Sequence, residues 1–281
     1  MTDIRGPLSA INFHCIRPCN AHCHFCFATF PGLVGQLSTA EAKRLIEVLR
    51  RPYPQKITFA GGEPTLRRDL AELIRFAKGL GYTTSVVTNG FRLEAVIDQV
   101  ADELDWVGLS VDSADEDVQR ALGRGPGDHV QNAIALAMRC HALGVRLKIN
   151  SVVTALNADE DMSDFIRLVR PERWKVFQVL RVVGQNDGSV EPLLIEDRAF
   201  AGFVARHAHL EAEGLGPVAE SNDAMTDSYV MIDPKGRFYG DTNGVHRESG
   251  PILQVGVAQA LRDVGFEFDK LVARGGIYQW A

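Results

Sequence analysis

The sequence predicts an α/β protein built as a partial, TIM-like (β/α)6 barrel with an α+β extension at its C-terminal end. Short runs rich in β-branched and aromatic residues alternate with helical patterns through residues 8–180. Such alternation builds parallel sheet from βαβ units. Six units are too few for a closed eight-fold barrel, which leaves an open barrel or a doubly wound sheet, and we favour the open barrel.

The elements of the barrel follow in order from these patterns. We expect strands at residues 8–14, 56–60, 83–88, 106–112, 145–153 and 173–180, and helices at 38–50, 68–80, 92–104, 129–144 and 159–169. Ser38 and Glu41 have the spacing of a capping box before the first helix. Gly81 and Gly144 stand where C-terminal caps end two others.

The pattern changes from Gly184 onward. We expect a helix at residues 196–213, a hairpin at 228–240 with Pro-Lys-Gly at its turn, a last helix near 254–265 and a strand-like end at 277–280. The chain then divides into a barrel, residues 1–182, and an extension, residues 183–281, that closes over the site.

Composition excludes several classes of protein. The 281 residues carry a formal net charge of −6, so the chain has no electrostatic footprint for nucleic acid. No apolar run has the length of a signal peptide or a membrane span, so we expect a cytoplasmic protein without a membrane anchor. We also expect the protein to be monomeric. Its cysteines would then be reduced and free to bind metal.

Three of the five cysteines lie together in CNAHCHFCF, at Cys19, Cys23 and Cys26, just after the first expected strand. They are too close in sequence to staple distant elements by disulfides. Three thiolates would leave one iron of a cubane cluster open to another ligand, whereas structural zinc usually takes two Cys-x-x-Cys pairs. Zinc or buried free thiols are the alternatives. Strand alternation turns Cys15 toward the core, and Cys140 stands alone in a helix.

These cysteines, with Phe25 before the last, resemble the motif of the radical S-adenosylmethionine (SAM) enzymes. GGEP with Gly61, Gly62 and Glu63, TNG with Thr88 and Asn89, and SVDS with Ser110 follow at successive strand ends, as in that superfamily. The resemblance implies a radical SAM barrel holding a [4Fe-4S] cluster on the three cysteines and SAM on the following loops. Arg124 of GRG is a further candidate contact for SAM.

A closer resemblance, over nearly the whole chain, is to the viperin family in its bacterial form. It rests on NFHCIRPCNAHCHFCF, ITFAGGEP, LKINSVV, RWKVFQ, ESN with DSY, and RGGIYQW. The resemblance implies an antiviral enzyme that converts a ribonucleoside triphosphate to its 3′-deoxy-3′,4′-didehydro analogue, with electrons from an unidentified one-electron donor. The alternatives are a radical SAM enzyme acting on another phosphorylated metabolite, and a non-catalytic iron–sulfur or zinc protein.

Alternation along the strands supports a polyanionic substrate independently. Polar residues on one face of each strand are expected to point into the barrel, namely Lys148, Arg173, Lys175, Lys56, Asn12 and His14. Buried cations need partners of opposite charge. Glu63 and Asp112 could pair with them but are too few, so a bound triphosphate is the better account.

The stretch 220–230 resembles the family's segment over the substrate, which makes Asn222 and Tyr229 candidate substrate contacts. The amide of Asn222 could pair with a base edge, and the similarity of ESN favours CTP over UTP or GTP. Asn222 could equally be a turn residue before a short helix or strand.

Overall fold

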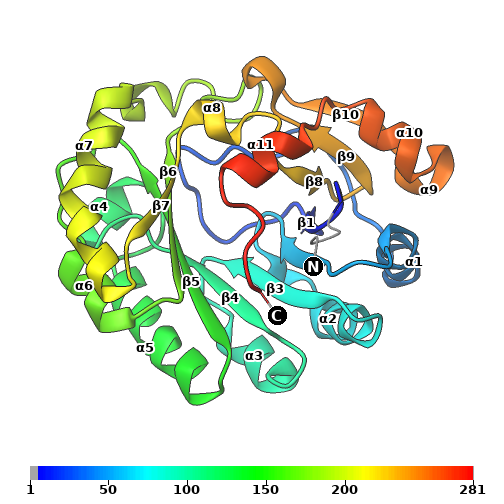
Figure 1. Ribbon diagram of the computed structural model, residues 1–281, viewed down its shortest axis with the longest axis horizontal. Helices are drawn as coiled ribbons and strands as arrows, with labels where there is room; N and C mark the ends of the chain where they lie inside the picture. Colours follow the sequence, from blue (N-terminus) through cyan, green and yellow to red (C-terminus); the bar gives the residue numbers. More distant parts are fainter. Residues whose placement is uncertain (1–5, 281) are drawn as a thin grey trace.

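The computed structural model describes residues 6–280, and its strands form one ten-stranded sheet. Six parallel strands follow one another in sequence order and curve into an open barrel (Figure 1). They are β1 (Ala10–His14), β2 (Lys56–Ala60), β3 (Thr83–Thr88), β4 (Trp106–Ser110), β5 (Arg146–Val153) and β6 (Arg173–Gln178). The predicted partial barrel is confirmed.

Helices cover the outside of this barrel (Figure 1). They are α1 (Thr39–Leu49), α2 (Leu70–Gly79), α3 (Glu94–Val100), α4 (Glu116–Ala121), α5 (His129–Ala142) and α6 (Ser163–Val169). The Ser38 hydroxyl accepts a bond from the backbone amide of Glu41, and the Glu41 carboxylate accepts one from the backbone amide of Ser38. These two bonds confirm the capping box. The sequence pattern overestimated α3 and α6 because turns and caps occupy the ends of both predicted stretches.

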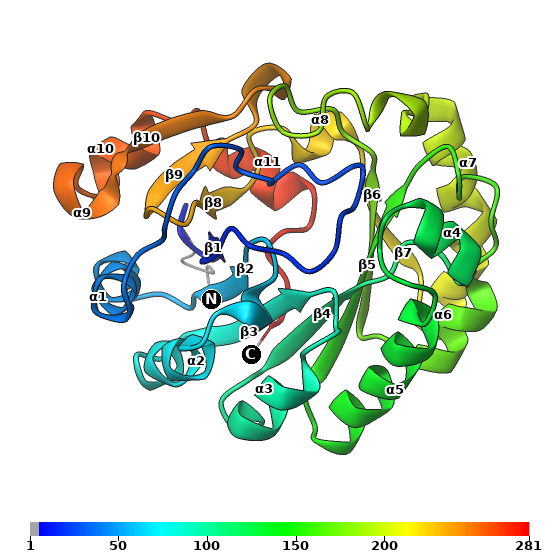
Figure 2. The same ribbon diagram turned by 180° about the vertical axis from the view of Figure 1, so that it is seen from behind.

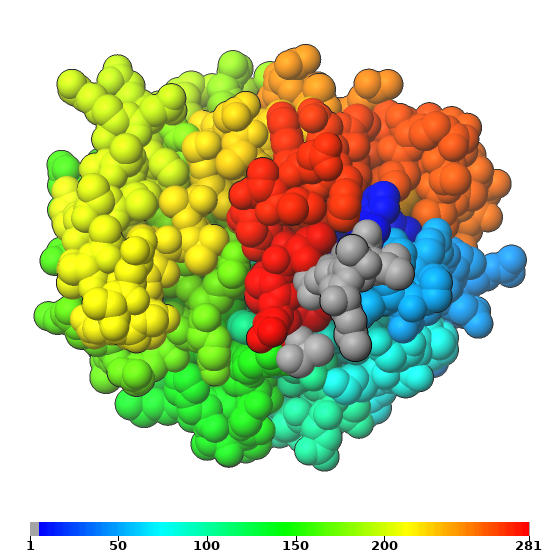
Figure 3. Space-filling view, viewed as in Figure 1, coloured from blue at the N-terminus to red at the C-terminus, as the bar shows by residue number. Residues whose placement is uncertain are grey.

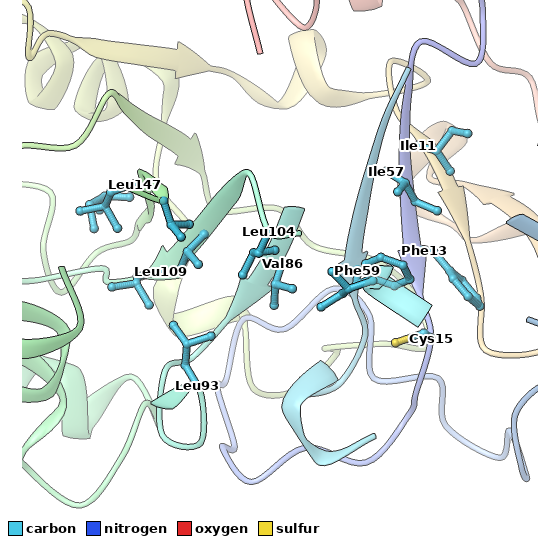
Figure 4. Close-up of a cluster of buried hydrophobic side chains, with 14 of the residues drawn as sticks. Ile11, Phe13, Cys15, Ile57, Phe59, Val86, Leu93, Leu104, Leu109 and Leu147 are labelled. Carbon is cyan, nitrogen blue, oxygen red and sulfur yellow. The ribbon is translucent and has the colours of Figure 1, made fainter. Parts of the chain in front are cut away.

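The main core lies between the strands and these helices. Ile11, Phe13, Ile57 and Phe59 point to this side from β1 and β2, and Cys15 continues their row (Figure 4). All five are almost completely buried. Cys15 is therefore a small core residue, as alternation along the first strand predicts.

The C-terminal part of the chain adds strands to both edges of the sheet. β7 (Pro217–Glu220) pairs in parallel with β6, and β8 (Val230–Ile232) pairs in parallel with β1. β9 (Arg237–Gly240) and β10 (Arg247–Pro251) follow antiparallel. The hairpin of β8 and β9 was predicted, but β7 and β10 were not, because four or five residues with glycine, proline or charge carry no clear period.

Further helices and 3-10 turns complete the described chain, and all but Pro64–Leu66 lie in its C-terminal part. They are α7 (Asp197–His207), α8 (Asn222–Met225), α9 (Ile252–Val255), α10 (Val257–Arg262), α11 (Phe268–Ala273) and the 3-10 turns Pro64–Leu66, Glu191–Leu193, Ala208–Glu213 and Thr242–Gly244. No helix among residues 6–280 has both the length and the apolarity needed to cross a bilayer.

The two ends of the barrel are covered by different segments. Residues 274–280 run across the middle of the barrel in Figures 1 and 3, and the loop after β1 crosses the opposite end in Figure 2. The expectation of a strand at residues 277–280 was wrong, since this segment has no ladder partner among the described strands. Its aromatic residues instead pack on side chains from the first positions of the strands.

Candidate active site

The loop that carries Cys19, Cys23 and Cys26 leaves the carboxyl end of β1, and all three thiols line one cavity inside the barrel. Backbone bonds from His22 to the carbonyl of Gly123 (3.0 Å) and from His24 to that of Leu122 (3.1 Å) hold the loop. Gly123 has φ +82°, and a Cβ there would lie 2.3 Å from the carbonyl oxygen of His22. Glycine is therefore required for this close contact.

The chemistry of the donor set fits an iron–sulfur cluster better than a single metal ion. The three cysteines are free thiols, and Cys23 and Cys26 are partly covered. No three His, Cys, Asp or Glu side chains among residues 6–280 are grouped as ligands of one ion. Each of three thiolates can bind a different iron of a cubane cluster, which leaves the fourth iron open to another ligand. Burial raises the pKa of Cys23 to about 12, and the positive charge of Arg124 opposes this rise.

The GGEP loop after β2 lies directly against the cysteine loop. A Cβ on Gly62 would lie 2.0 Å from the carbonyl oxygen of Arg17, so the two backbones approach too closely for any side chain. Glu63 is buried and accepts hydrogen bonds from the Thr88 hydroxyl (2.7 Å) and from the backbone amide of Asn89 (2.9 Å). The carboxylate thus ties the ends of β2 and β3 together beside the cavity.

Arg124 is held beside the same loops by an ion pair and a ring contact. Its guanidinium forms a buried ion pair with Asp112, after β4, and lies 5.2 Å from the ring centre of Phe25. Asp112 raises the pKa of Arg124 although burial opposes this. All the residues predicted to contact SAM line the cavity, namely Phe25, Gly61, Gly62, Glu63, Thr88, Asn89, Ser110 and Arg124.

Cations from β5 and β6 form another wall of the cavity. Lys148 and Lys175 both line it and are 8% and 7% exposed. Burial lowers the pKa of Lys148 to about 8. Lys175 forms an ion pair with Glu220 of β7 and donates to the Tyr229 hydroxyl (2.7 Å). The inward direction predicted for both lysines agrees with their burial beside the cavity.

Glu220 is a site residue that sequence reasoning missed. Glu63 and Asp112 are the interior carboxylates that the sequence predicts, but Glu220 is also fully buried and pairs with both Lys175 and Arg274 (3.1 Å). The motifs ESN and RGG contain Glu220 and Arg274, but their distance in sequence hides the pairing. Arg274 also lies 3.6 Å from the ring centre of Tyr229.

Lys56 and Arg173 lie near Lys148, as expected, and Arg173 is its register partner on β6, but their polar ends turn toward the C-terminal segment and not into the cavity. Nζ of Lys56 donates to the Tyr278 hydroxyl (2.6 Å), and Nη2 of Arg173 donates to the carbonyl of Gly275 (2.8 Å). Neither is among the described residues that line the cavity. Alternation identifies the face of a strand but not the direction in which a long side chain then extends, and both residues begin their strands, next to the C-terminal segment.

Of the other predicted substrate contacts, three line the cavity and one does not. Asn12 and His14 of β1 line the cavity together with Tyr229. Burial lowers the pKa of His14 to about 3, so its ring is neutral. Asn222 does not line the cavity in the described part of the chain: it begins α8, and its amide donates to the carbonyl of Val179 (3.2 Å). These contacts fit the alternative of a turn residue before a short helix, while Oδ1 of Asn222 is buried without a partner among the described residues, and contact with a base stays a prediction.

This fold and its cysteine site define a radical SAM enzyme. A sequence model of the Radical SAM superfamily matches residues 15–169. Among solved structures, anSMEcpe with bound AdoMet and a Kp18Cys peptide has a TM-score of 0.72 at 14% identity, covering 96% of this chain and 84% of that chain. Coproporphyrinogen III oxidase (HemN) of Escherichia coli has a TM-score of 0.59 at 12% identity, covering 96% and 75%. The cofactors of the superfamily are a [4Fe-4S] cluster and SAM.

The chain belongs to the family of S-adenosylmethionine-dependent nucleotide dehydratases, the viperin-like enzymes. It is 42% identical to the enzyme of that name from Flammeovirga pacifica, covering 97% of this chain and 96% of the relative. It is 33% identical to that of Thermoplasmatales archaeon (strain ISO4-H5), covering 99% and 98%. It is 37% identical to the dehydratase RSAD2 of Oncorhynchus mykiss, covering 97% and 81%.

Proposed function

We propose that this enzyme removes water from a ribonucleoside triphosphate and forms its 3′-deoxy-3′,4′-didehydro analogue. CTP is the favoured substrate, and UTP and GTP are the alternatives. The observation that carries the proposal is that Lys148 and Lys175 line the same cavity as the three cysteines. A molecule that occupies this cavity can meet both the cations and the position of the cluster.

The charge balance inside the barrel favours a polyanion. Glu220 is the carboxylate that pairs with Lys175 and Arg274, and Lys148 has no ion pair within the described residues. Burial lowers the pKa values of Lys148 and Lys175, which means that their charged forms are poorly compensated. The phosphates of a nucleotide would supply the missing negative charge through charge-assisted hydrogen bonds.

The cofactors would supply the radical chemistry, and the residues of the chain would bind and orient the cofactors and the substrate. The reduced cluster and SAM, when bound, supply the 5′-deoxyadenosyl radical that takes the hydrogen from C4′ of the substrate. Cys19, Cys23 and Cys26 would hold the cluster, and the loops around Glu63 and Arg124 would position SAM. The lysines would fix the phosphates, so the ribose is held in one orientation and water is excluded from the reacting carbon.

The preference for CTP is supported by the similarity of Glu220, Ser221 and Asn222 to the ESN of the animal enzymes. The product has no 3′-hydroxyl group, so a polymerase that incorporates it cannot extend the chain. This chemistry fits a role in antiviral, anti-phage defence.

The experiment is an anaerobic incubation of the dithionite-reduced holoenzyme with SAM and each ribonucleoside triphosphate in turn. Mass spectrometry should detect 5′-deoxyadenosine and a nucleotide lighter by one water. Matched reactions with the nucleoside lacking phosphates are the control. Formation of 5′-deoxyadenosine without any dehydrated nucleotide would point to another phosphorylated metabolite, and its absence under all conditions would contradict an enzymatic role.

A further inference from the structure

Asp241 is a cavity residue without a role in the site described above. It follows β9, is 6% exposed and lines the same cavity as the cysteines. Met231 of β8 pairs with Tyr239 of β9 and with Asn12 of β1. Asp241 therefore belongs to the wall of β1, β8 and β9, and these strands lie on the opposite side of the barrel from β5 and β6 (Figure 1).

The surroundings of Asp241 raise the pKa of its carboxyl group. Oδ1 accepts a bond from the backbone amide of Asp227 (3.3 Å), and no cation forms an ion pair with Asp241 among the described residues. Burial raises the pKa of Asp241, and the charge of Asp227 adds to the rise. Lys270 of α11 and the backbone amides oppose it, and the charge of Asp241 in turn contributes to the raised pKa of Tyr239.

Loss of a 3′-hydroxyl group calls for an acid in the cavity, because hydroxide is a poor leaving group. Glu63 accepts hydrogen bonds on both oxygens, so it is not free to donate. The His14 ring is neutral, with a pKa of about 3. The Tyr229 hydroxyl is bonded to Glu220, and burial raises its pKa well above the usual value.

We propose that Asp241 is the acid that protonates the departing 3′-hydroxyl group of the nucleotide. After the hydrogen at C4′ has been removed, the C3′–O bond breaks, the Asp241 proton joins the leaving oxygen, and water departs. The sugar is left as a radical cation, which a low-potential one-electron donor reduces to the C3′=C4′ double bond. Asp241 remains as a carboxylate and recovers its proton from solvent.

This inference rests on the proposed dehydration of a nucleotide, and its test separates hydrogen removal from water loss. The holoenzyme and Asp241→Asn are compared on CTP, UTP and GTP deuterated at C4′. Asp241→Asn should still form deuterated 5′-deoxyadenosine, while the dehydrated nucleotide falls by about 10² to 10⁴-fold. Asp241→Glu should recover part of the product, because it restores a carboxyl group.

Two further measurements exclude a purely structural role. The rate of product formation should fall as pH rises through the raised pKa of Asp241, and this alkaline limb should be missing in Asp241→Asn. The resting protein should show an infrared band of a protonated carboxyl group that disappears in the same variant.

Equal loss of deuterated 5′-deoxyadenosine and product in Asp241→Asn would overturn the assignment, as would undiminished product. If the unaltered enzyme transfers no deuterium from any of the three triphosphates, the proposed function itself fails, and the assignment fails with it. The infrared band would then still report whether Asp241 is protonated.

Discussion

Nζ of Lys56, the first residue of β2, lies 2.6 Å from the hydroxyl of Tyr278, 222 residues later in the chain. The same ammonium lies 4.6 Å from the centre of the Tyr278 ring and 5.4 Å from that of Trp280. Trp106 Nε1 also donates to the carbonyl of Trp280 (3.0 Å). The C-terminal segment thus closes one end of the barrel, away from the cysteine loop.

Tyr278→Phe should destabilise the fold because it removes the hydroxyl group that accepts from Lys56 and leaves a buried ammonium with less compensation. We expect a loss of about 1 to 3 kcal/mol in the free energy of unfolding, measured by urea denaturation. Tyr53→Phe, at a half-buried tyrosine, is the matched control and should change it by less than about 0.5 kcal/mol. Equal effects of the two variants would contradict this reading of the contact.

Replacing Cys19, Cys23 or Cys26 by alanine should abolish the cluster, because each removes one of three thiolate ligands. Cys15→Ala and Cys140→Ala should keep it, since both residues are buried in the core. Iron content and visible absorbance after anaerobic reconstitution provide the measurement. A full four-iron cluster in any of the first three variants, or its loss in Cys15→Ala, would show that the ligand set is wrong.

Lys148→Ala should weaken nucleotide binding by about one to two decades, since one charge-assisted phosphate contact contributes roughly 1.5 to 3 kcal/mol. The fold should be little affected, because Lys148 has no ion pair among the described residues. Titration calorimetry with the triphosphate, and with the nucleoside as control, measures the effect. A similar loss for the nucleoside would contradict phosphate binding by this lysine.

Lys175→Ala should weaken both binding and the fold. It leaves the buried Glu220 with Arg274 as its remaining charged partner, and breaking a buried pair from one side costs about 3 to 5 kcal/mol. Lys175→Ala should therefore lower the free energy of unfolding much more than Lys148→Ala does. The double variant Lys175→Met with Glu220→Gln should recover part of the stability, and no recovery would argue against the pair as the cause.

Nucleotide binding should take up protons above pH 8. Burial holds the pKa of Lys148 at about 8, so the free protein loses this proton as pH rises through that value. Bound phosphate raises the pKa again, so binding restores the proton and the affinity falls as pH increases. Calorimetry at about pH 8.5 in two buffers of different ionisation enthalpy measures the uptake. Lys148→Met should lose most of it, and unchanged uptake would assign the proton to another group.

Asn222→Ala should lower the turnover of CTP, UTP and GTP in parallel. Its amide donates to the carbonyl of Val179 at the start of α8 and its side chain does not line the cavity among the described residues, so we expect it to stabilise this turn for all three substrates. Product formation from equimolar mixtures of the three triphosphates gives the ratios directly. A selective loss of turnover with one triphosphate would show that Asn222 contributes to base recognition.

Much of the barrel and of the cofactor loops could be predicted from local sequence. Alternating side chains along β1 identified Cys15 as a core residue and His14 as an inward one, because successive residues of a strand point to opposite faces. The motifs around Cys19, Glu63 and Thr88 each follow a parallel strand, and the carboxyl ends of such strands meet at one end of a barrel. Their convergence on one cavity therefore followed from order along the chain.

Contacts between distant segments were decided by the tertiary structure alone. The pairing of Lys175 with Glu220 requires β7 to join the edge of β6, and the contact of Lys56 with Tyr278 requires the last segment to cross the barrel. Asp241 reaches the cavity because an antiparallel strand after β8 places it there. Sequence by itself determined which residues point inward, through the period of the strand. Height along the barrel and the choice of partner depended on chain packing, because local periodicity carries no information about either.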